Sequence, residues 1–181
     1  MSPDRVYPDE RSGPFLEPPL TFTDRNGREI EIRLYEEGDR ESLTEMYVEF
    51  DPADRAQGIP PSGESRVERW LDVILEDGCD VVALDGGRVI GHATLVPDGD
   101  EGMELAIFVF QTHQSAGIGS RLIRALLGHA ASEGVEYVWL TVERWNSLAV
   151  GLYESVGFET SNVESFELEM SIRIAQTEST G

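Results

Sequence analysis

The stretch FVFQTHQSAGIGSRLIRALL (108–127) joins a run of apolar residues to a helical pattern. Between the two stands QSAGIG (114–119), which has two glycines and no charged side chain. A strand, a glycine-containing loop and a helix N-terminus in this order can form an anion site, because backbone N–H groups and the positive end of the helix dipole point to one place. The stretch therefore predicts a strand, a helix over 117–133 and an anion site between them.

Three phosphate-binding motifs can be compared with this loop. A P-loop requires a lysine after its last glycine, and the chain contains no lysine. The dinucleotide motif G-x-G-x-x-G requires a glycine at position 122, where Leu122 stands. The pattern Q-x-x-G-x-G fits, with Gln114, Gly117 and Gly119. On this motif alone, the alternative that the glycines only permit a tight turn and a close helix–sheet approach stays open.

Acidic residues dominate the composition. The chain has 35 acidic and 14 basic residues and a net charge of −21, and every basic residue is an arginine. Phosphate backbones and anionic lipids are bound by clustered cations, so this balance argues against both nucleic acid and a membrane surface as partners. It is typical of proteins that stay hydrated in concentrated salt, where charge repulsion is screened over about 3 Å at 1 M. We therefore favour an acidic, halophilic protein of haloarchaeal type.

The length and the cysteine content suggest a single domain in a reducing compartment. A chain of 181 residues can bury one sizeable core. The single cysteine, Cys79, excludes an internal disulfide framework. Residues 1–19 contain no apolar signal region, and no apolar run approaches the roughly 18 residues that a membrane helix requires. We expect a soluble, cytoplasmic protein.

The spacing of apolar residues predicts alternating strands and helices. Hairpins are expected around Asn26-Gly27 and around the Asp-Gly-Gly turn at 85–87. Helical spacing marks 43–50 and 67–75. The later elements are a strand over 103–110, the helix over 117–133, a strand over 137–142, a short helix with Leu148, Leu152 and Val156 facing inward, and a final strand in which Phe166, Leu168, Met170, Ile172 and Ile174 alternate with polar residues.

This order of elements predicts an α/β fold with a mixed, mostly antiparallel sheet of about six to seven strands, flanked by about four helices. Residues 1–20 carry several prolines and are interpreted as an extended arm. Residues 21–176 form one expected domain, and 177–181 form a C-terminal tail.

The region from Met103 to Phe158 resembles the GCN5-related N-acetyltransferase (GNAT) family. It contains a strand ending in Val109, the Q-x-x-G-x-G loop with its amphipathic helix, and the element N-x-x-A-x-x-L-Y-E-x-x-G-F from Asn146 to Phe158. The resemblance implies a GNAT-like sheet and acetyl-CoA as co-substrate. In that family the loop amides hold the pyrophosphate of coenzyme A.

The resemblance also implies which residues contact the coenzyme. The glycines would allow the pyrophosphate to approach the backbone, and the strand end would bind pantetheine through its main chain. Arg121 and Arg124 lie near the helix N-terminus, where a nearby phosphate would favour a cation; a purely solvent-facing role stays open for both. The expected coenzyme-binding residues are Phe108, Val109, Gln114, Ser115, Ala116, Gly117, Ile118, Gly119, Ser120, Arg121 and Asn146.

Direct transfer of an acetyl group to a primary amine is the implied reaction. Glu104, five residues before Val109, is the expected base and acts through water, with His92 as the alternative. Tyr153 is the expected proton donor to the departing thiolate. Both have plain alternatives, a solvated strand glutamate and a tyrosine that packs on the sheet. Asn146 either contacts the coenzyme or caps the following helix.

The sequence leaves the acceptor open between a small molecule and a protein. The acidic charge favours a cationic acceptor such as a lysine side chain or a polyamine, and a homodimer stays open. No metal is expected, because His92, His113 and His129 form no ligand pattern and Cys79 has no histidine at a recognisable spacing. The alternative function is a non-catalytic acyl-CoA-binding sensor or interaction domain, which would share the loop but not the roles of Glu104 and Tyr153.

Overall fold

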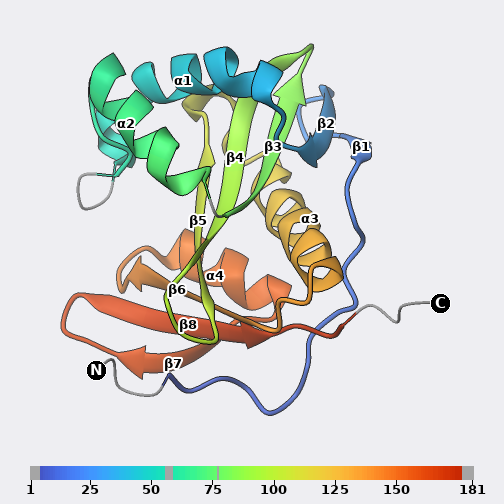
Figure 1. Ribbon diagram of the computed structural model, residues 1–181, viewed down its shortest axis with the longest axis vertical. Helices are drawn as coiled ribbons and strands as arrows, with labels where there is room; N and C mark the ends of the chain where they lie inside the picture. Colours follow the sequence, from blue (N-terminus) through green and yellow to red (C-terminus); the bar gives the residue numbers. More distant parts are fainter. Residues whose placement is uncertain (1–4, 56–58, 77, 177–181) are drawn as a thin grey trace.

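The computed structural model describes residues 5–55, 59–76 and 78–176, in which four α-helices accompany one sheet (Figure 1). The sheet has eight strands in the order β1-β2-β3-β4-β5-β6-β8-β7. The elements in chain order are β1 (Leu20–Thr23), β2 (Glu29–Leu34), η1 (Glu37–Asp39), α1 (Arg40–Val48), η2 (Pro52–Asp54), α2 (Glu64–Ile74), β3 (Cys79–Asp85), β4 (Arg88–Pro97), β5 (Met103–Val109), η3 (Gln111–His113), α3 (Ile118–Ser132), β6 (Tyr137–Glu143), α4 (Ser147–Val156), β7 (Glu159–Val163) and β8 (Glu167–Arg173).

The predicted mixed, mostly antiparallel sheet with four helices is confirmed, with one strand more than expected. The additional strand is β7, whose sequence ETSNV has no apolar alternation. It lies at the edge of the sheet and pairs with β8 alone among the described strands. An edge strand with mostly exposed side chains needs no apolar face, which explains why the pattern missed it.

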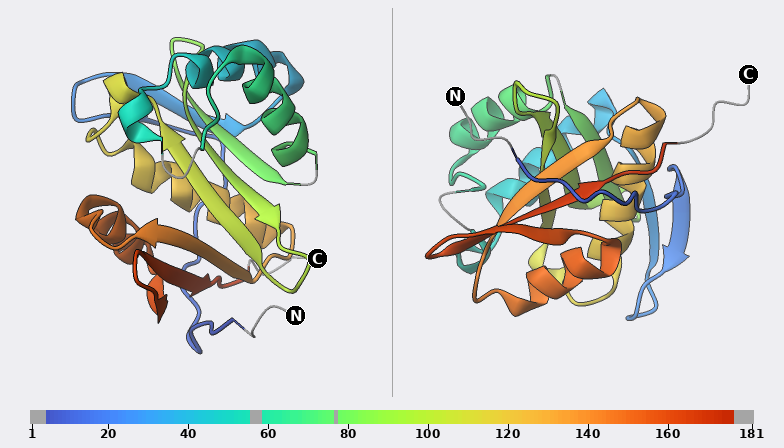
Figure 2. Two further views of the ribbon diagram at one scale, coloured as in Figure 1. Left: turned by 90° about the vertical axis from the view of Figure 1, so that its left-hand side faces the viewer. Right: turned by 90° about the horizontal axis from the view of Figure 1, so that it is seen from below.

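Strands β5 and β6 form the parallel pair of named strands, and they are joined over a short distance only. Met103 pairs with Val138 and Glu104 with Trp139, while the rest of β5 pairs with β4 alone. Beyond Glu104 the two strands diverge, so that the sheet opens toward the end of β5. Figures 1 and 2 show the two strands meeting at one end and separating toward the other.

The helices cover opposite faces of the sheet. Tyr47 of α1 stacks edge-on against Phe108 of β5 and contacts His92 of β4. On the other face, Leu122 of α3 lies 3.2 Å from the position that a Cβ on Gly91 would occupy. Because neighbouring residues of a strand point to opposite faces, α1 and α3 lie on opposite sides of β4 (Figure 1).

The core follows the predicted pattern in α3 and departs from it in α4 and β8. The α3 residues Ile118, Leu122, Leu126 and Ala130 are buried as expected. Leu148 was expected to face inward but is 84% exposed, because it lies in the first turn of α4, beyond the core that buries Val156. Phe166 is 69% exposed, since it precedes β8 and lies in the turn after β7.

The segment 5–19 begins on the face of the sheet opposite α3 and α4, where it passes beside β8 and β6, and then runs along α3 toward β1 (Figures 1 and 2). The carbonyl groups of Phe15 and Leu16 lie against Gly128 of α3. Ser12 forms a bridge with Ile174, its N–H donating to the carbonyl of Arg173 at 2.8 Å. The rings of Tyr7 and Tyr137 lie 4.7 Å apart between centroids. We refer to residues 5–19 as the N-terminal arm.

Candidate active site

The loop between β5 and α3 presents several free backbone N–H groups. Ser115 has φ = 59° and is the only non-glycine residue with left-handed φ in the part of the chain that the structure describes. Gly117 has φ = 89° and is the N-cap of α3, with no side-chain cap. Among the described residues, no acceptor is found for the backbone N–H groups of Ser115 and of residues 117 to 120. Alternating backbone conformations of this kind can turn successive N–H groups toward an anion.

Two arginines flank this loop. Arg121 Nη1 and Arg25 Nε would lie 3.3 Å and 3.8 Å from a Cβ on Gly117. The backbone N–H of Arg25 also donates to the carbonyl of Ala116 at 3.1 Å. Within the described ranges neither guanidinium forms an ion pair, although acids outnumber arginines in the chain. Arg25 lies in the β1–β2 turn, and no pattern in the sequence links it to a loop about ninety positions later, so it was not among the predicted site residues.

Gly119 is required for a different reason from Gly117. A Cβ at Gly119 would lie 3.3 Å from Leu152 Cδ2 of α4. Gly119 therefore permits close packing between α3 and α4, which is one of the alternatives that the sequence left open. Gly117 instead adopts a backbone conformation that is strained for any other residue.

Successive residues of β5 direct their main-chain N–H and C=O groups alternately toward β4 and toward the opening of the sheet. The N–H of Phe110 donates to the carbonyl of Ile90 at 2.8 Å, so the groups of Phe108, two residues earlier, also face β4. The groups of Ile107 and Val109 consequently face the opening. The Val109 carbonyl is occupied, because Gln114 Nε2 donates to it at 3.0 Å. Gln114 also donates to Asp54 at 3.0 Å and thus fixes the end of the strand.

Glu104 lies where β5 and β6 are still paired, half-buried on the face opposite α3. Burial raises the pKa of its carboxyl group; Arg5 opposes this shift and Asp98 adds to it. On β4, the hydroxyl of Thr94 is buried on the same face and has no hydrogen-bond partner among the described residues. A buried hydroxyl of this kind can hold an ordered water.

Tyr153 and Asn146 both belong to α4, but they are held differently. Burial raises the pKa of Tyr153 to about 12, and its ring packs against Phe158 at 5.9 Å. The phenol therefore keeps its proton throughout the neutral range. Asn146 is the N-cap of α4, and its Oδ1 accepts from the N–H of Ala149 at 3.2 Å. Of the two roles considered for Asn146, the cap is the one observed.

His92 has no route to a substrate. Its ring is fully buried, with Nδ1 2.6 Å from the Tyr47 hydroxyl and Nε2 2.6 Å from Asp80 Oδ1. Both ring nitrogens are thus occupied inside the core. His113 lies beside the loop, where its Nε2 is 2.9 Å from Asp85 Oδ2. The described residues contain no group of three or more histidine, cysteine or acidic side chains that could hold a metal ion.

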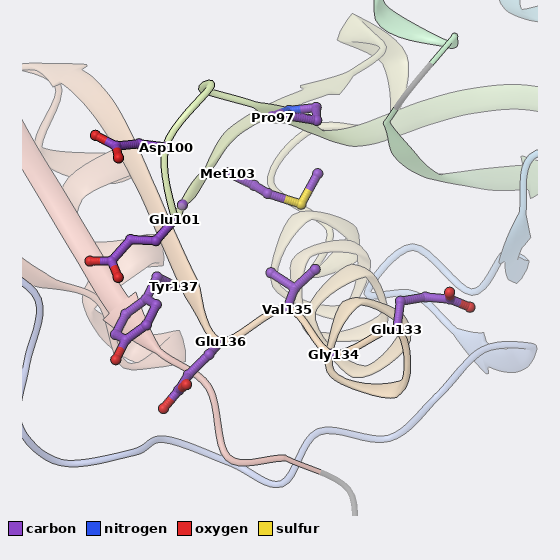
Figure 3. Close-up of a pocket in the computed structure, with 10 residues that line it drawn as sticks. Pro97, Asp100, Glu101, Met103, Glu133, Gly134, Val135, Glu136 and Tyr137 are labelled. Atoms are coloured by element: carbon purple, nitrogen blue, oxygen red, sulfur yellow. The ribbon is translucent and has the colours of Figure 1, made fainter. Parts of the chain in front are cut away.

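A cavity of about 360 Å³ lies away from the loop, where β5 and β6 begin (Figure 3). It is lined by the β4–β5 loop and by the turn between α3 and β6. Its acids include Asp100, Glu101 and Glu133, which are exposed, and Glu136, which pairs with Arg11 and Arg173 at 2.9 and 2.8 Å. None of the loop N–H groups lines this cavity, so we do not place the reaction there.

These features are typical of one class of protein, the acetyltransferases whose mixed sheet splays open between two parallel strands. They are the glycine loop before α3, the opening between β5 and β6, and the order of the helices. The family model "Acetyltransferase (GNAT) family" matches residues 40–158, and the chain belongs to this family. No helix among the described residues has the length and apolarity needed to cross a membrane.

Curated relatives share part of this sequence. An uncharacterized N-acetyltransferase of Mycobacterium tuberculosis is 29% identical over 49% of this chain and 57% of its own. This chain thus spans little more than half the length of that relative. The [ribosomal protein bS18]-alanine N-acetyltransferase of Escherichia coli is 34% identical over 66% of this chain and 78% of its own.

Solved structures share the fold. The GNAT domain of S. lividans PAT superposes with a TM-score of 0.72 at 17% identity, over 86% of this chain and 97% of that one. The ribosomal-protein-alanine N-acetyltransferase of Brucella melitensis gives a TM-score of 0.66 at 23% identity, over 79% and 99%.

Proposed function

We propose that this protein is an acetyl-CoA-dependent N-acetyltransferase that moves an acetyl group directly to a primary amine. The observation that carries the proposal is the divergence of β5 from β6 between Glu104 and the glycine loop. It leaves main-chain groups of one strand free between an anion-binding loop and a half-buried carboxylate. Membership of the acetyltransferase family supports the same reaction.

The coenzyme phosphates bind in this proposal at the N–H groups of residues 115 to 120, with Arg121 and Arg25 supplying positive charge. Pantetheine runs along β5 and binds Ile107 and Val109, in place of Phe108, whose main chain faces β4. Gln114 acts indirectly by holding the Val109 carbonyl. Asn146 acts as the cap that orients α4.

The reaction forms one C–N bond and breaks one C–S bond. The amine must first lose a proton, which passes through an ordered water to Glu104. The N–H of Val109 stabilises the negative charge that develops on the thioester oxygen. The departing thiolate, with an ordinary thiol pKa near 8.5, takes a proton or a hydrogen bond from Tyr153.

Three finer proposals rest on composition and family. An acidic excess of this size suits a halophilic, haloarchaeal-type cytoplasm, where salt screens the repulsion between carboxylates. A homodimer is a further proposal, to be measured by light scattering.

Calorimetric titration with acetyl-CoA and CoA, followed by an acceptor screen, tests the function. We expect binding of both coenzymes and release of CoA thiol when an amine is added. Binding without turnover on any amine would favour the second candidate, a non-catalytic acyl-CoA sensor. In such a sensor, the exposed side chains of Trp145 and Phe166 near the end of β6 would form a docking surface for a partner. Absence of coenzyme binding would contradict both.

A further inference from the structure

The guanidinium of Arg5, in the N-terminal arm, is bound by side chains of β6 and β8. The guanidinium carbon of Arg5 lies 3.3 Å from the centroid of the Trp139 ring. Its Nε donates to Glu169 Oε1 at 2.8 Å, and its Nη1 lies 3.8 Å from Asp98 Oδ2. The indole N–H of Trp139 donates to Asp98 at 2.9 Å and orients that carboxylate. We call Trp139, Asp98 and Glu169 the cation box.

The cation box lies beside the candidate base. Trp139 is the register partner of Glu104, and the charges of Arg5 and Asp98 both act on the pKa of Glu104. Beyond this pair the strands separate. The box is on the face opposite α3, whereas the phosphate loop begins α3. An acceptor that approaches the thioester from the face without coenzyme would therefore pass the box.

Arg5 is held through its side chain, and the backbone that follows it is bound by side chains of β8: Ser171 Oγ donates to the Val6 carbonyl at 2.9 Å, and Arg173 Nη1 donates to the Asp9 carbonyl at 3.0 Å. Residues 5–11 make no backbone–backbone hydrogen bond within the described part of the chain, and the first such bonds are at Ser12. A cavity of about 170 Å³ separates part of this segment from β7 and β8. Ser171 and Glu159, which line that cavity, continue the register row of Glu104 and Trp139 across the sheet. Arg5 can thus leave the box without breaking a strand pairing.

We propose that the cation box binds the second positive charge of the acceptor, and that Arg5 occupies this position when no acceptor is bound. The inference rests on the proposed N-acetyltransferase activity and names its substrate class, a small aliphatic amine that carries another cationic group. An aromatic face, the Glu169 carboxylate at hydrogen-bond distance and the Asp98 carboxylate at 3.8 Å select a cation by cation–π attraction, a charge-assisted hydrogen bond and ion pairing. With that charge fixed in the box, the reactive amine at the other end of the molecule lies toward Glu104.

Agmatine and butylamine provide a direct comparison, because both have a primary amine on a four-carbon chain and only agmatine adds a guanidinium. When release of CoA thiol is measured, the kcat/KM for agmatine should be at least about tenfold higher than that for butylamine. Asp98→Asn and Glu169→Gln should remove this preference by lowering the kcat/KM for agmatine toward that for butylamine. Glu167→Gln, on the same strand and face as Glu169, is the matched control and should retain it.

Binding provides a readout that does not need turnover. Calorimetry in the presence of CoA should show that Arg5→Gln binds agmatine about tenfold more tightly than the parent protein, because the internal competitor is gone. Adding Asp98→Asn to Arg5→Gln should abolish that gain. An unchanged affinity in Arg5→Gln overturns the inference, as do equal rates for the two amines or a preference for a basic peptide over agmatine. Agmatine binding without acetylation of any amine would overturn the proposed function and retain the cation box.

Discussion

Glu104 and Trp139 are the last residues at which β5 and β6 are paired, and the two strands separate directly beyond them. The side chains of this pair share the face opposite α3, so the candidate base stands at the start of the opening and beside Arg5.

Replacement of Glu104 by Gln should remove the base and keep its size. Turnover should fall by about 10²-fold or more, while the affinity for acetyl-CoA changes by less than about threefold, because the carboxylate acts after binding. The raised pKa of Glu104 means that its ionised form, and with it turnover, is lost on acidification at a higher pH than for an ordinary glutamate. That acidic limb of the kcat profile should disappear in the variant. Wild-type turnover at neutral pH would show Glu104 to be a structural acid; Glu133→Gln, at an exposed position, is the control.

Tyr153→Phe should give a smaller loss of turnover than Glu104→Gln, and the loss should grow at high pH. Without the phenol, the thiolate leaves unprotonated and can return to the acyl group. The ring contact with Phe158 is retained, so the melting temperature should change little. Stopped-flow detection of CoA across pH 7 to 9.5 measures the effect. A uniform loss at every pH would assign Tyr153 to packing.

The glycine at position 117 should be essential for coenzyme binding. Gly117→Ala strains a left-handed residue and moves the N–H groups at the start of α3. Affinity for CoA, measured by calorimetry, should fall by about tenfold or more. Gly134→Ala is the matched control, since Gly134 has φ = 86° and open space around its Cβ position, away from the loop. It should lose comparable stability and keep its affinity; equal affinities in the two variants would sink the loop assignment.

Arg25→Gln should weaken coenzyme binding although the residue lies outside the family motif. The variant removes a cation beside Gly117, and Arg66→Gln removes the same charge at an exposed position on α2 as the control. We expect the CoA affinity to fall by about three- to tenfold in Arg25→Gln only. Repeating the titration with 3′-dephospho-CoA separates the two phosphate sites. A deficit that vanishes with this ligand assigns Arg25 to the 3′-phosphate, whereas a persistent deficit assigns it to the pyrophosphate.

Stability should rise steeply with KCl. The net charge is −21, so the carboxylates on the surface repel one another. The screening length of this repulsion falls from about 10 Å at 0.1 M salt to about 3 Å at 1 M. Thermal melts over this range should show a rising midpoint. Sucrose at equal osmolality should produce a smaller rise, because it does not screen charge. A midpoint that stays flat in KCl contradicts the halophile proposal.

The features that the sequence determined by itself are local. Gly117 needs a backbone conformation available to few residues, and the 3.6-residue period of Ile118, Leu122, Leu126 and Ala130 requires a buried helix face. Both requirements act within a few neighbouring residues, so the loop, the helices and most strands could be predicted from spacing. Glu104 and Tyr153 entered the candidate site through the resemblance to the acetyltransferase family, and their roles stay predictions.

The tertiary structure decided whatever depends on register or on contacts between distant segments. The direction of the Phe108 main chain follows from its pairing with β4, and the exposure of Leu148 follows from where the core ends beside α4. Arg25 reaches Gly117, and Arg5 reaches Trp139, only because the fold closes long loops between them. Such contacts are set by the packing of the whole sheet and leave no periodic pattern in the chain. For this reason the position of Arg25 beside Gly117 and that of Arg5 over Trp139 could be found only in the tertiary structure.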